Sequence, residues 1–191
     1  YRPPLSMVIS PVPESPSKDL QTLHVMTANT ALGPEWLNAK FCFESSVTRA
    51  DRIASTLLSQ TDTALPDLFL AQEVWDDQAT QILVDRLKSK YPYILHSVGS
   101  NVLGRSSGLL VASLLPITAA EFHHFDSYPR EDSLANKGIL YLETQVGDRR
   151  IAVYILHSVS PEDDHSADLR IHHLSQLLDD IRQRHAAVDD V

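Results

Sequence analysis

The chain has 191 residues, 43% hydrophobic and 21% charged, which is enough for one domain to bury a core without disulfides or structural metals. Six glycines, eleven prolines and the absence of a visible repeat exclude collagen-like and low-complexity proteins. The formal net charge of −9 lacks the basic excess with which proteins hold nucleic-acid phosphates, so it disfavours a nucleic-acid partner. No apolar run approaches the roughly 20 residues of a membrane-spanning helix.

The first 18 residues contain five prolines. Because proline lacks a backbone N–H donor and blocks helix formation, we expect residues 1–18 to form an irregular arm. Residues 19–191 are expected to form one folded unit, because no composition shift or linker interrupts them. Cys42 is the single cysteine, which excludes an intramolecular disulfide framework and indicates a small buried hydrophobe.

The first half of the chain alternates between strand and helix patterns. Short apolar runs are typical of strands, whereas apolar residues spaced three and four apart predict helices. These patterns predict a strand at 23–30, a helix at 48–60, a strand at 67–72 and a helix at 77–90. Thr48 and Asp51 form a Thr-x-x-Asp capping box, so we expect them to begin the first of these helices.

The second half predicts a run of strands and then a helix. Strand-like runs separated by short turns occur at 93–98, 108–113, 118–125, 138–146 and 149–158. Leucines and isoleucines at helical spacing predict a helix over 166–185. The α/β segments followed by a meander favour an α/β sandwich over an all-parallel doubly wound sheet.

Two polar residues stand at the ends of predicted strands. Glu73 directly follows the strand at 67–72, where its carboxylate could serve as a hard oxygen ligand for Mg²⁺ or be an ordinary solvated acid. Asn29 ends the strand at 23–30, where its amide could bind a metal, its water or a phosphate oxygen, or simply form a turn.

Three further residues could contact a phosphate. His157 closes the last predicted strand and could donate a hydrogen bond to a phosphoryl oxygen, or be a half-buried structural histidine. Asp132 and Lys137 lie in the loop before the strand at 138–146, where the ammonium could compensate phosphate charge. The alternative is a solvated loop pair that contributes about 0–1 kcal/mol.

Other enzyme signatures fail in this sequence. The Gly-x-Ser-x-Gly match at 104–108 is preceded by a polar loop and followed by a strand, whereas a nucleophile elbow needs a strand and then a helix. There is no His-Glu-x-x-His motif, and the adjacent His172 and His173 indicate a solvated helix surface and not a zinc site. No glycine-rich phosphate loop is present.

Taken together, residues 20–185 resemble the endonuclease/exonuclease/phosphatase superfamily of Mg²⁺-dependent phosphoesterases. The run LHVMTANT is similar to the superfamily's first strand, with its metal-site asparagine at Asn29. The run PDLFLAQEVWD is similar to its Gln-Glu-Val segment, with the metal-binding glutamate at Glu73, and SGLLVASLLPI to a glycine-containing strand. The run IAVYILHS places the superfamily's histidine at His157. The resemblance implies a β-sandwich flanked by helices, a four-layer α/β/β/α arrangement, and a Mg²⁺ cofactor.

Within this superfamily the chain looks most like neutral and bacterial sphingomyelinases. The run EDSLANKGILYLE is similar to their Asp/Lys pair, which falls on Asp132 and Lys137. The resemblance implies hydrolysis of sphingomyelin to ceramide and phosphocholine, with His157 and Lys137 binding phosphoryl oxygens and Asp132 orienting Lys137. It also implies a phospholipid substrate at a membrane surface and a secreted or membrane-associated location, with a cytoplasmic one left open.

The sequence departs from this pattern in two respects. Leu156 and Ser158 stand where the superfamily has threonine and leucine around the histidine. The Gly-Asp-x-Asn and Ser-Asp-His segments, which carry the water-positioning residues and the general base, do not occur. We therefore interpret the chain as the N-terminal two-thirds of such a domain and expect it to be inactive or nearly so by itself. The alternatives are a non-catalytic binding or regulatory remnant, or a hydrolase of inositol phosphates or nucleic acid.

Overall fold

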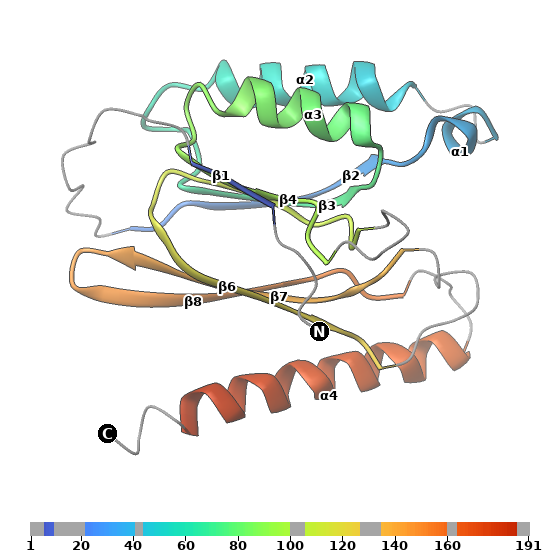
Figure 1. The fold of residues 1–191 in the computed structure, drawn as a ribbon, viewed down its shortest axis with the longest axis vertical. Helices are drawn as coiled ribbons and strands as arrows, with labels where there is room; N and C mark the ends of the chain where they lie inside the picture. The colour runs from blue at the N-terminus through green and yellow to red at the C-terminus, as the bar shows by residue number, and fades with distance from the viewer. Residues whose placement is uncertain are drawn as a thin grey trace.

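The computed structural model describes residues 6–9, 22–40, 44–99, 106–126, 135–159 and 164–186. Over these ranges the chain forms two β-sheets packed face to face, with helices on both outer sides (Figure 1). This four-layer α/β/β/α sandwich confirms the fold class predicted from the sequence. That residues 19–191 form one unit without an internal boundary stays a prediction.

The larger sheet has five strands in the order β1-β4-β5-β3-β2. Its members are β1 (Ser6–Ile9), β2 (Val25–Leu32), β3 (Leu68–Val74), β4 (Tyr93–His96) and β5 (Leu110–Ser113). Strands β2 and β3 are parallel, and the other pairs are antiparallel. Helices α2 (Ser46–Leu58) and α3 (Asp77–Leu87) cover its outer face (Figure 1).

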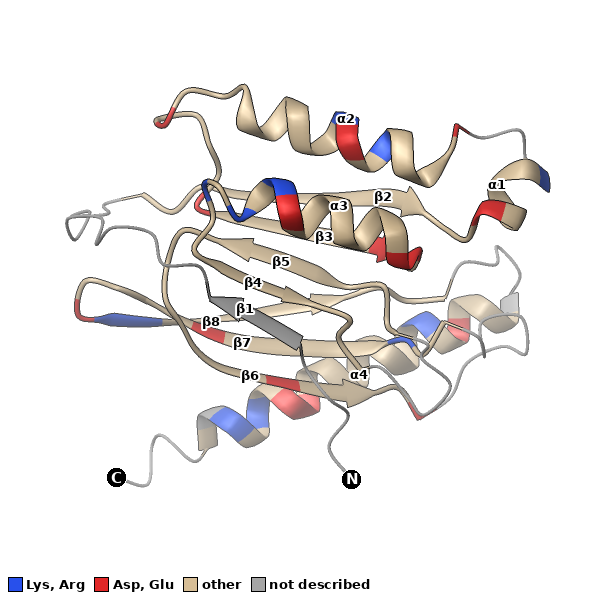
Figure 2. Ribbon diagram, turned by 45° about the horizontal axis from the view of Figure 1, so that its top comes forward, with Lys and Arg blue, Asp and Glu red and all other residues tan. Residues whose placement is uncertain are grey.

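The smaller sheet is an antiparallel meander of three strands. It consists of β6 (Ile117–His124), β7 (Gly138–Val146) and β8 (Arg149–Leu156). Helix α4 (Asp164–Ala186) lies along its outer face (Figures 1 and 2). Among the described strands, the edges of the larger sheet are β1 and β2, and those of the smaller sheet are β6 and β8.

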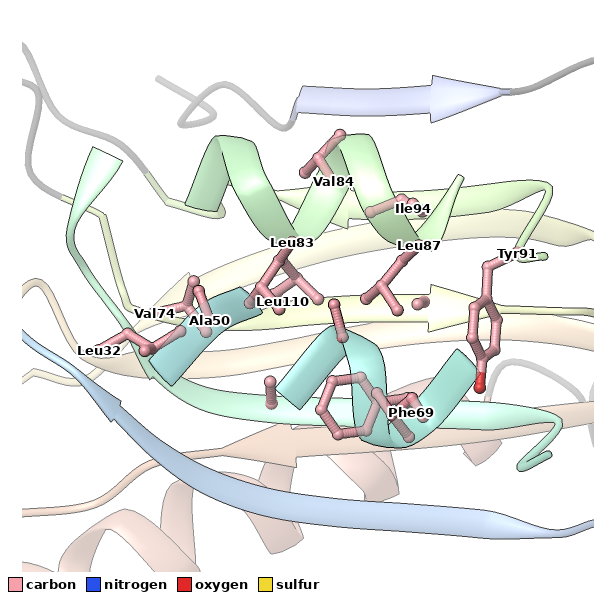
Figure 3. Packing of buried hydrophobic residues seen from close by; sticks show 14 of the residues in the cluster. Leu32, Ala50, Phe69, Val74, Leu83, Val84, Leu87, Tyr91, Ile94 and Leu110 are labelled. Atoms are coloured by element: carbon pink, nitrogen blue, oxygen red, sulfur yellow. The ribbon is translucent and has the colours of Figure 1, made fainter. Parts of the chain in front are cut away.

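Strand β3 is buried on both faces because it separates two hydrophobic clusters. Phe69, labelled in Figure 3, and Ala71 belong to the cluster beneath α2 and α3. Leu68 and Leu70 belong to the cluster between the two sheets. The alternation follows from the two-residue period of a strand, and it confirms the buried strand predicted at 67–72.

The expectation of an irregular arm over residues 1–18 is wrong for Ser6–Ile9. These four residues form β1, which pairs antiparallel with β4 at the edge of the larger sheet. The segment lies between prolines but contains none, and an edge strand tolerates prolines next to it because its outer N–H groups need no partner.

The predicted capping box at Thr48 and Asp51 is also wrong. Helix α2 begins at Ser46, with Ser45 as its N-cap residue, and Ser45 makes no side-chain cap hydrogen bond. The cap comes from a distant residue, because Glu35 Oε1 accepts from Ser46 N at 2.8 Å. Glu35 belongs to α1 (Glu35–Lys40), a short helix that the sequence pattern did not predict.

Helix α4 turns a largely polar face toward the smaller sheet. Arg184 is bonded to Asp180 and Glu121, and its guanidinium lies 3.9 Å from the centre of the Tyr141 ring. Burial raises the pKa of Tyr141 to about 12. Two of the leucines that define the helical spacing, Leu174 and Leu178, face outward instead and are about half exposed.

Stability should fall on mild acidification, because burial in β4 lowers the pKa of His96 below its ordinary value of 6.5. As the pH falls through 6.5, the unfolded chain binds a proton that the folded chain does not, so the free energy of unfolding decreases. We expect His96→Gln to flatten this decrease between pH 7.5 and 5.5 in urea unfolding. The exposed His172 is the control, and an equal flattening by His172→Gln would contradict the assignment.

Candidate active site

Three polar side chains predicted from the sequence meet at one end of the sandwich. Asn29 Nδ2 in β2 donates to Glu73 Oε1 in β3 at 2.8 Å. His157 Nε2, directly after β8, lies 3.4 Å from the same carboxylate oxygen. The site therefore spans both sheets. The Glu73 and His157 side chains are 22% and 17% exposed, so both are largely buried but still reached by solvent.

A reversal in the backbone of β3 turns Glu73 toward His157. Phe69, Ala71 and Val74 all belong to the helix-facing cluster, so the two-residue alternation is broken between Ala71 and Val74. Glu73 occupies the break with a φ of 62°, and the register with β2 shifts at the same place. A left-handed backbone at a non-glycine residue costs roughly 1–3 kcal/mol and is concentrated at functional sites.

Two backbone contacts stabilise this conformation. Val74 N donates to the carbonyl of Gly108 at 2.9 Å, and Trp75 N donates to the carbonyl of Leu32 at 3.0 Å. The residues on either side of Glu73 cannot shift without losing these hydrogen bonds or the pairing with β2. The strain at Glu73 is thus held by neighbouring strands.

Trp75 forms a wall of the site. Its ring lies 5.8 Å from that of His157, at a tilt of 37°. Gly108 packs under the indole with a φ of 74°, and a Cβ atom there would lie 2.5 Å from Trp75 Nε1. The last glycine of the Gly-x-Ser-x-Gly match therefore makes room for Trp75. No signal in the sequence marks Trp75 as a site residue, although it follows Glu73 by two positions.

Lys137 lies beside the histidine strand. Its side chain is buried, and its Nζ donates to the carbonyl of Ser158 at 3.0 Å, one residue beyond His157. The preceding Asn136 has a φ of 42° and donates from Nδ2 to the carbonyl of Gly99. The predicted partner of Lys137, Asp132, lies outside the described residues.

Ser158, which stands where the superfamily has leucine, connects the site to α4. Ser158 Oγ lies 2.8 Å from Nδ1 of His173, and the His173 ring stacks on Phe125 at 3.7 Å. His173 is fully buried, so the expectation that both His172 and His173 lie on a solvated surface is wrong for His173. Its burial depends on the packing of α4 against the loops, which the helical pattern does not encode.

Glu73 and Asn29 are a suitable donor set for a hard divalent cation. Glu73 Oε1 accepts from Asn29, whereas Oε2 has no hydrogen-bond partner among the described residues. Asn29 Oδ1 accepts from Ala31 N at 3.1 Å and retains a second lone pair. Within the same ranges no three His, Cys, Asp or Glu side chains cluster as a metal site. One carboxylate with an amide oxygen fits Mg²⁺, which usually keeps several water ligands, better than Zn²⁺.

The chain has clear relatives among curated proteins. Sphingomyelin phosphodiesterase 3 of Homo sapiens is 32% identical over 159 residues, which cover 71% of this chain and 24% of the relative. Sphingomyelin phosphodiesterase 5 of Mus musculus is 30% identical over 182 residues, which cover 77% of this chain and 37% of the relative. This chain is similar in sequence to sphingomyelin phosphodiesterases, and it spans 24% and 37% of the length of these two relatives. No protein-family model matches it.

Solved structures show the same fold. Sphingomyelinase C from Streptomyces griseocarneus has a TM-score of 0.73 at 24% identity, over 85% of this chain and 59% of that chain. A mutant of beta toxin from Staphylococcus aureus with bound magnesium ions has a TM-score of 0.71 at 20% identity, with the same coverage of both chains. The chain thus shares their fold and spans about three-fifths of these solved structures.

Trp75 and Gly108 provide a test of how the site is built. We expect Gly108→Ala to lower the free energy of unfolding by about 2–5 kcal/mol, since a Cβ both strains the backbone and displaces Trp75. Gly147 has a similar φ of 57° but nothing within 4 Å of its Cβ position, so Gly147→Ala should cost only the backbone part, about 1–2 kcal/mol. Urea unfolding and the near-ultraviolet dichroism of tryptophan measure both variants. Equal effects would show that Trp75 adapts freely.

Proposed function

We propose that this chain carries the metal- and phosphate-binding part of a Mg²⁺-dependent phosphodiesterase that hydrolyses sphingomyelin to ceramide and phosphocholine. The observation that carries the proposal is the meeting of Asn29, Glu73 and His157 across two sheets. The homology to sphingomyelin phosphodiesterases supports the substrate, and a structural neighbour with bound magnesium ions supports the metal.

Glu73 and Asn29 would hold the metal ion. Asn29 Nδ2 fixes Glu73 Oε1, which leaves Oε2 as the metal-facing oxygen. Mg²⁺, when bound, neutralises phosphate charge and stabilises a leaving alkoxide. The strained backbone at Glu73 keeps the carboxylate aimed at this place before any ligand arrives.

His157 and Lys137 would bind the phosphoryl group. The His157 ring lies beside Glu73 and against Trp75, so it is held in place to donate a hydrogen bond to a phosphoryl oxygen. Lys137 places a positive charge close to His157, because its Nζ donates to the carbonyl of the next residue, Ser158. We propose that Asp132 orients Lys137.

In-line attack by water needs a base with a pKa near the operating pH, which is most often a histidine. The superfamily carries this base in a Ser-Asp-His segment, which these 191 residues do not contain. We therefore propose that the chain binds metal and phosphocholine but does not by itself turn over sphingomyelin.

The proposed site of action is a membrane surface, in a secreted or membrane-associated protein. In the part of the chain that the structure describes, no helix has both the length and the apolar character to cross a bilayer.

Glu73→Gln should weaken Mg²⁺ binding to the chain at least tenfold, because it removes the negative charge from the proposed ligand and keeps its shape. Titration calorimetry with Mg²⁺, and with Mn²⁺ as a spectroscopic substitute, measures the effect. Glu44→Gln is the control, since Glu44 pairs with Arg52 on the surface of α2. An unchanged Mg²⁺ affinity of the Glu73→Gln variant would contradict the assignment of Glu73 as a metal ligand.

His157→Asn should weaken phosphocholine binding to the Mg²⁺-loaded chain about 2–10-fold, the range expected for the loss of one hydrogen bond, with little change in Mg²⁺ affinity. Phosphorus NMR titrations with phosphocholine, an inositol phosphate and a short DNA measure the effect and rank the substrate classes. His172→Asn on the exposed face of α4 is the control. Tighter binding of DNA or the inositol phosphate than of phosphocholine would contradict the proposed substrate.

A further inference from the structure

Helix α1 presents an exposed tryptophan. The Trp36 side chain is 66% exposed, the largest exposed fraction among the big hydrophobic side chains of the described residues. A tryptophan normally buries 150–250 Å² in a core or an interface, because its ring is large and mostly apolar. An outward-facing tryptophan therefore marks a contact surface more often than a charged residue would.

The exposure of Trp36 does not result from a loosely attached helix. Glu35 Oε1 accepts from Ser46 N at 2.8 Å and from Ser45 Oγ at 3.0 Å. Asn38 is buried and donates from Nδ2 to Ser46 Oγ at 2.8 Å and to the carbonyl of Gly33 at 3.2 Å. These contacts attach the inner face of α1 to the start of α2 and fix which residues point outward.

The outward face of α1 combines aromatic, small and basic residues. Trp36, Ala39 and Lys40 are all exposed and lie three and four positions apart, so they share one face of the helix. Tryptophan and lysine are the residues that favour the boundary between water and lipid headgroups, because each has an apolar body and a polar end.

Helix α1 lies at the same end of the sandwich as the candidate site. It begins three residues after β2 ends at Leu32, and Asn29 lies in β2 three residues before that end. Figure 1 shows α1 protruding beyond the end of the larger sheet, apart from the layer formed by α2 and α3. A surface touched by Trp36 would therefore adjoin the end where Glu73 lies.

We infer that the outward face of α1 docks on a zwitterionic phospholipid surface, with Trp36 entering the headgroup region of the bilayer. The inference rests on the proposed function, which places the substrate in such a surface. The net charge of −9 opposes binding to anionic lipid, so choline headgroups are the surface that suits this chain. The contact is weak and orienting, since one aromatic side chain supplies most of it.

Tryptophan fluorescence reports on this contact directly. The chain has two tryptophans, and Trp75 is partly buried beside His157 in the candidate site, so the part of a vesicle-induced change that Trp36→Ala removes is the part that originates from Trp36. With vesicles of phosphatidylcholine and sphingomyelin we expect a blue shift and reduced quenching by acrylamide. Trp36→Ala should abolish the shift and lower vesicle co-sedimentation at least fivefold, while its far-ultraviolet dichroism stays that of the parent chain.

A matched control uses the other exposed apolar face. Leu178 on α4 is about half exposed, and Leu178→Ala should leave vesicle binding unchanged. The inference is overturned if the parent chain does not bind zwitterionic vesicles, if Trp36→Ala binds them equally well, or if binding needs phosphatidylserine. It is also overturned if Leu178→Ala removes binding. The Mg²⁺ and phosphocholine titrations test the proposed function separately, because they contain no vesicles.

Discussion

The left-handed backbone at Glu73 is the constraint on which the candidate site depends. A regular strand would direct this carboxylate to the helix-facing side of the sheet, among Phe69 and Ala71. The reversal gives that side to Val74 and turns Glu73 toward His157 on the other sheet. The free-energy cost of the left-handed backbone is offset by pairing on both sides of β3, through the hydrogen bond of Val74 N to the carbonyl of Gly108 and the pairing with β2.

Because Glu73 is turned toward the second sheet, the site forms only when the two sheets pack together. Glu73 and His157 belong to different sheets, so their separation is set by the apolar cluster between the sheets, which includes Leu70, Leu140 and Ile155. Burial of this cluster supplies the free energy that holds the two strand ends together. A rigid scaffold with polar groups at strand ends is how a fold can aim ligands at a metal and a phosphate at once.

The fold was predictable wherever an element is specified by the pattern of its own neighbouring residues. The apolar run of β3 and the helical spacing in α3 are properties of a few neighbouring residues, and the bounds of both elements lie within three residues of the predicted ones. Strand β1, helix α1 and the cap of α2 depend on partners far along the chain, such as Glu35 for Ser46, and no local pattern encodes such partners. The outward turn of Leu178 likewise reflects the polar contacts of Arg184.

For the site, the sequence by itself determined which chemical groups lie near the ends of which strands: an amide at Asn29, a carboxylate at Glu73 and an imidazole at His157. Only the tertiary structure decided that these groups meet, that Glu73 points away from the helices, and that Gly108 makes room for Trp75. The physical reason is that strand identity follows from nearby residues. Distances between strand ends follow instead from sheet packing and from hydrogen bonds that join distant parts of the chain.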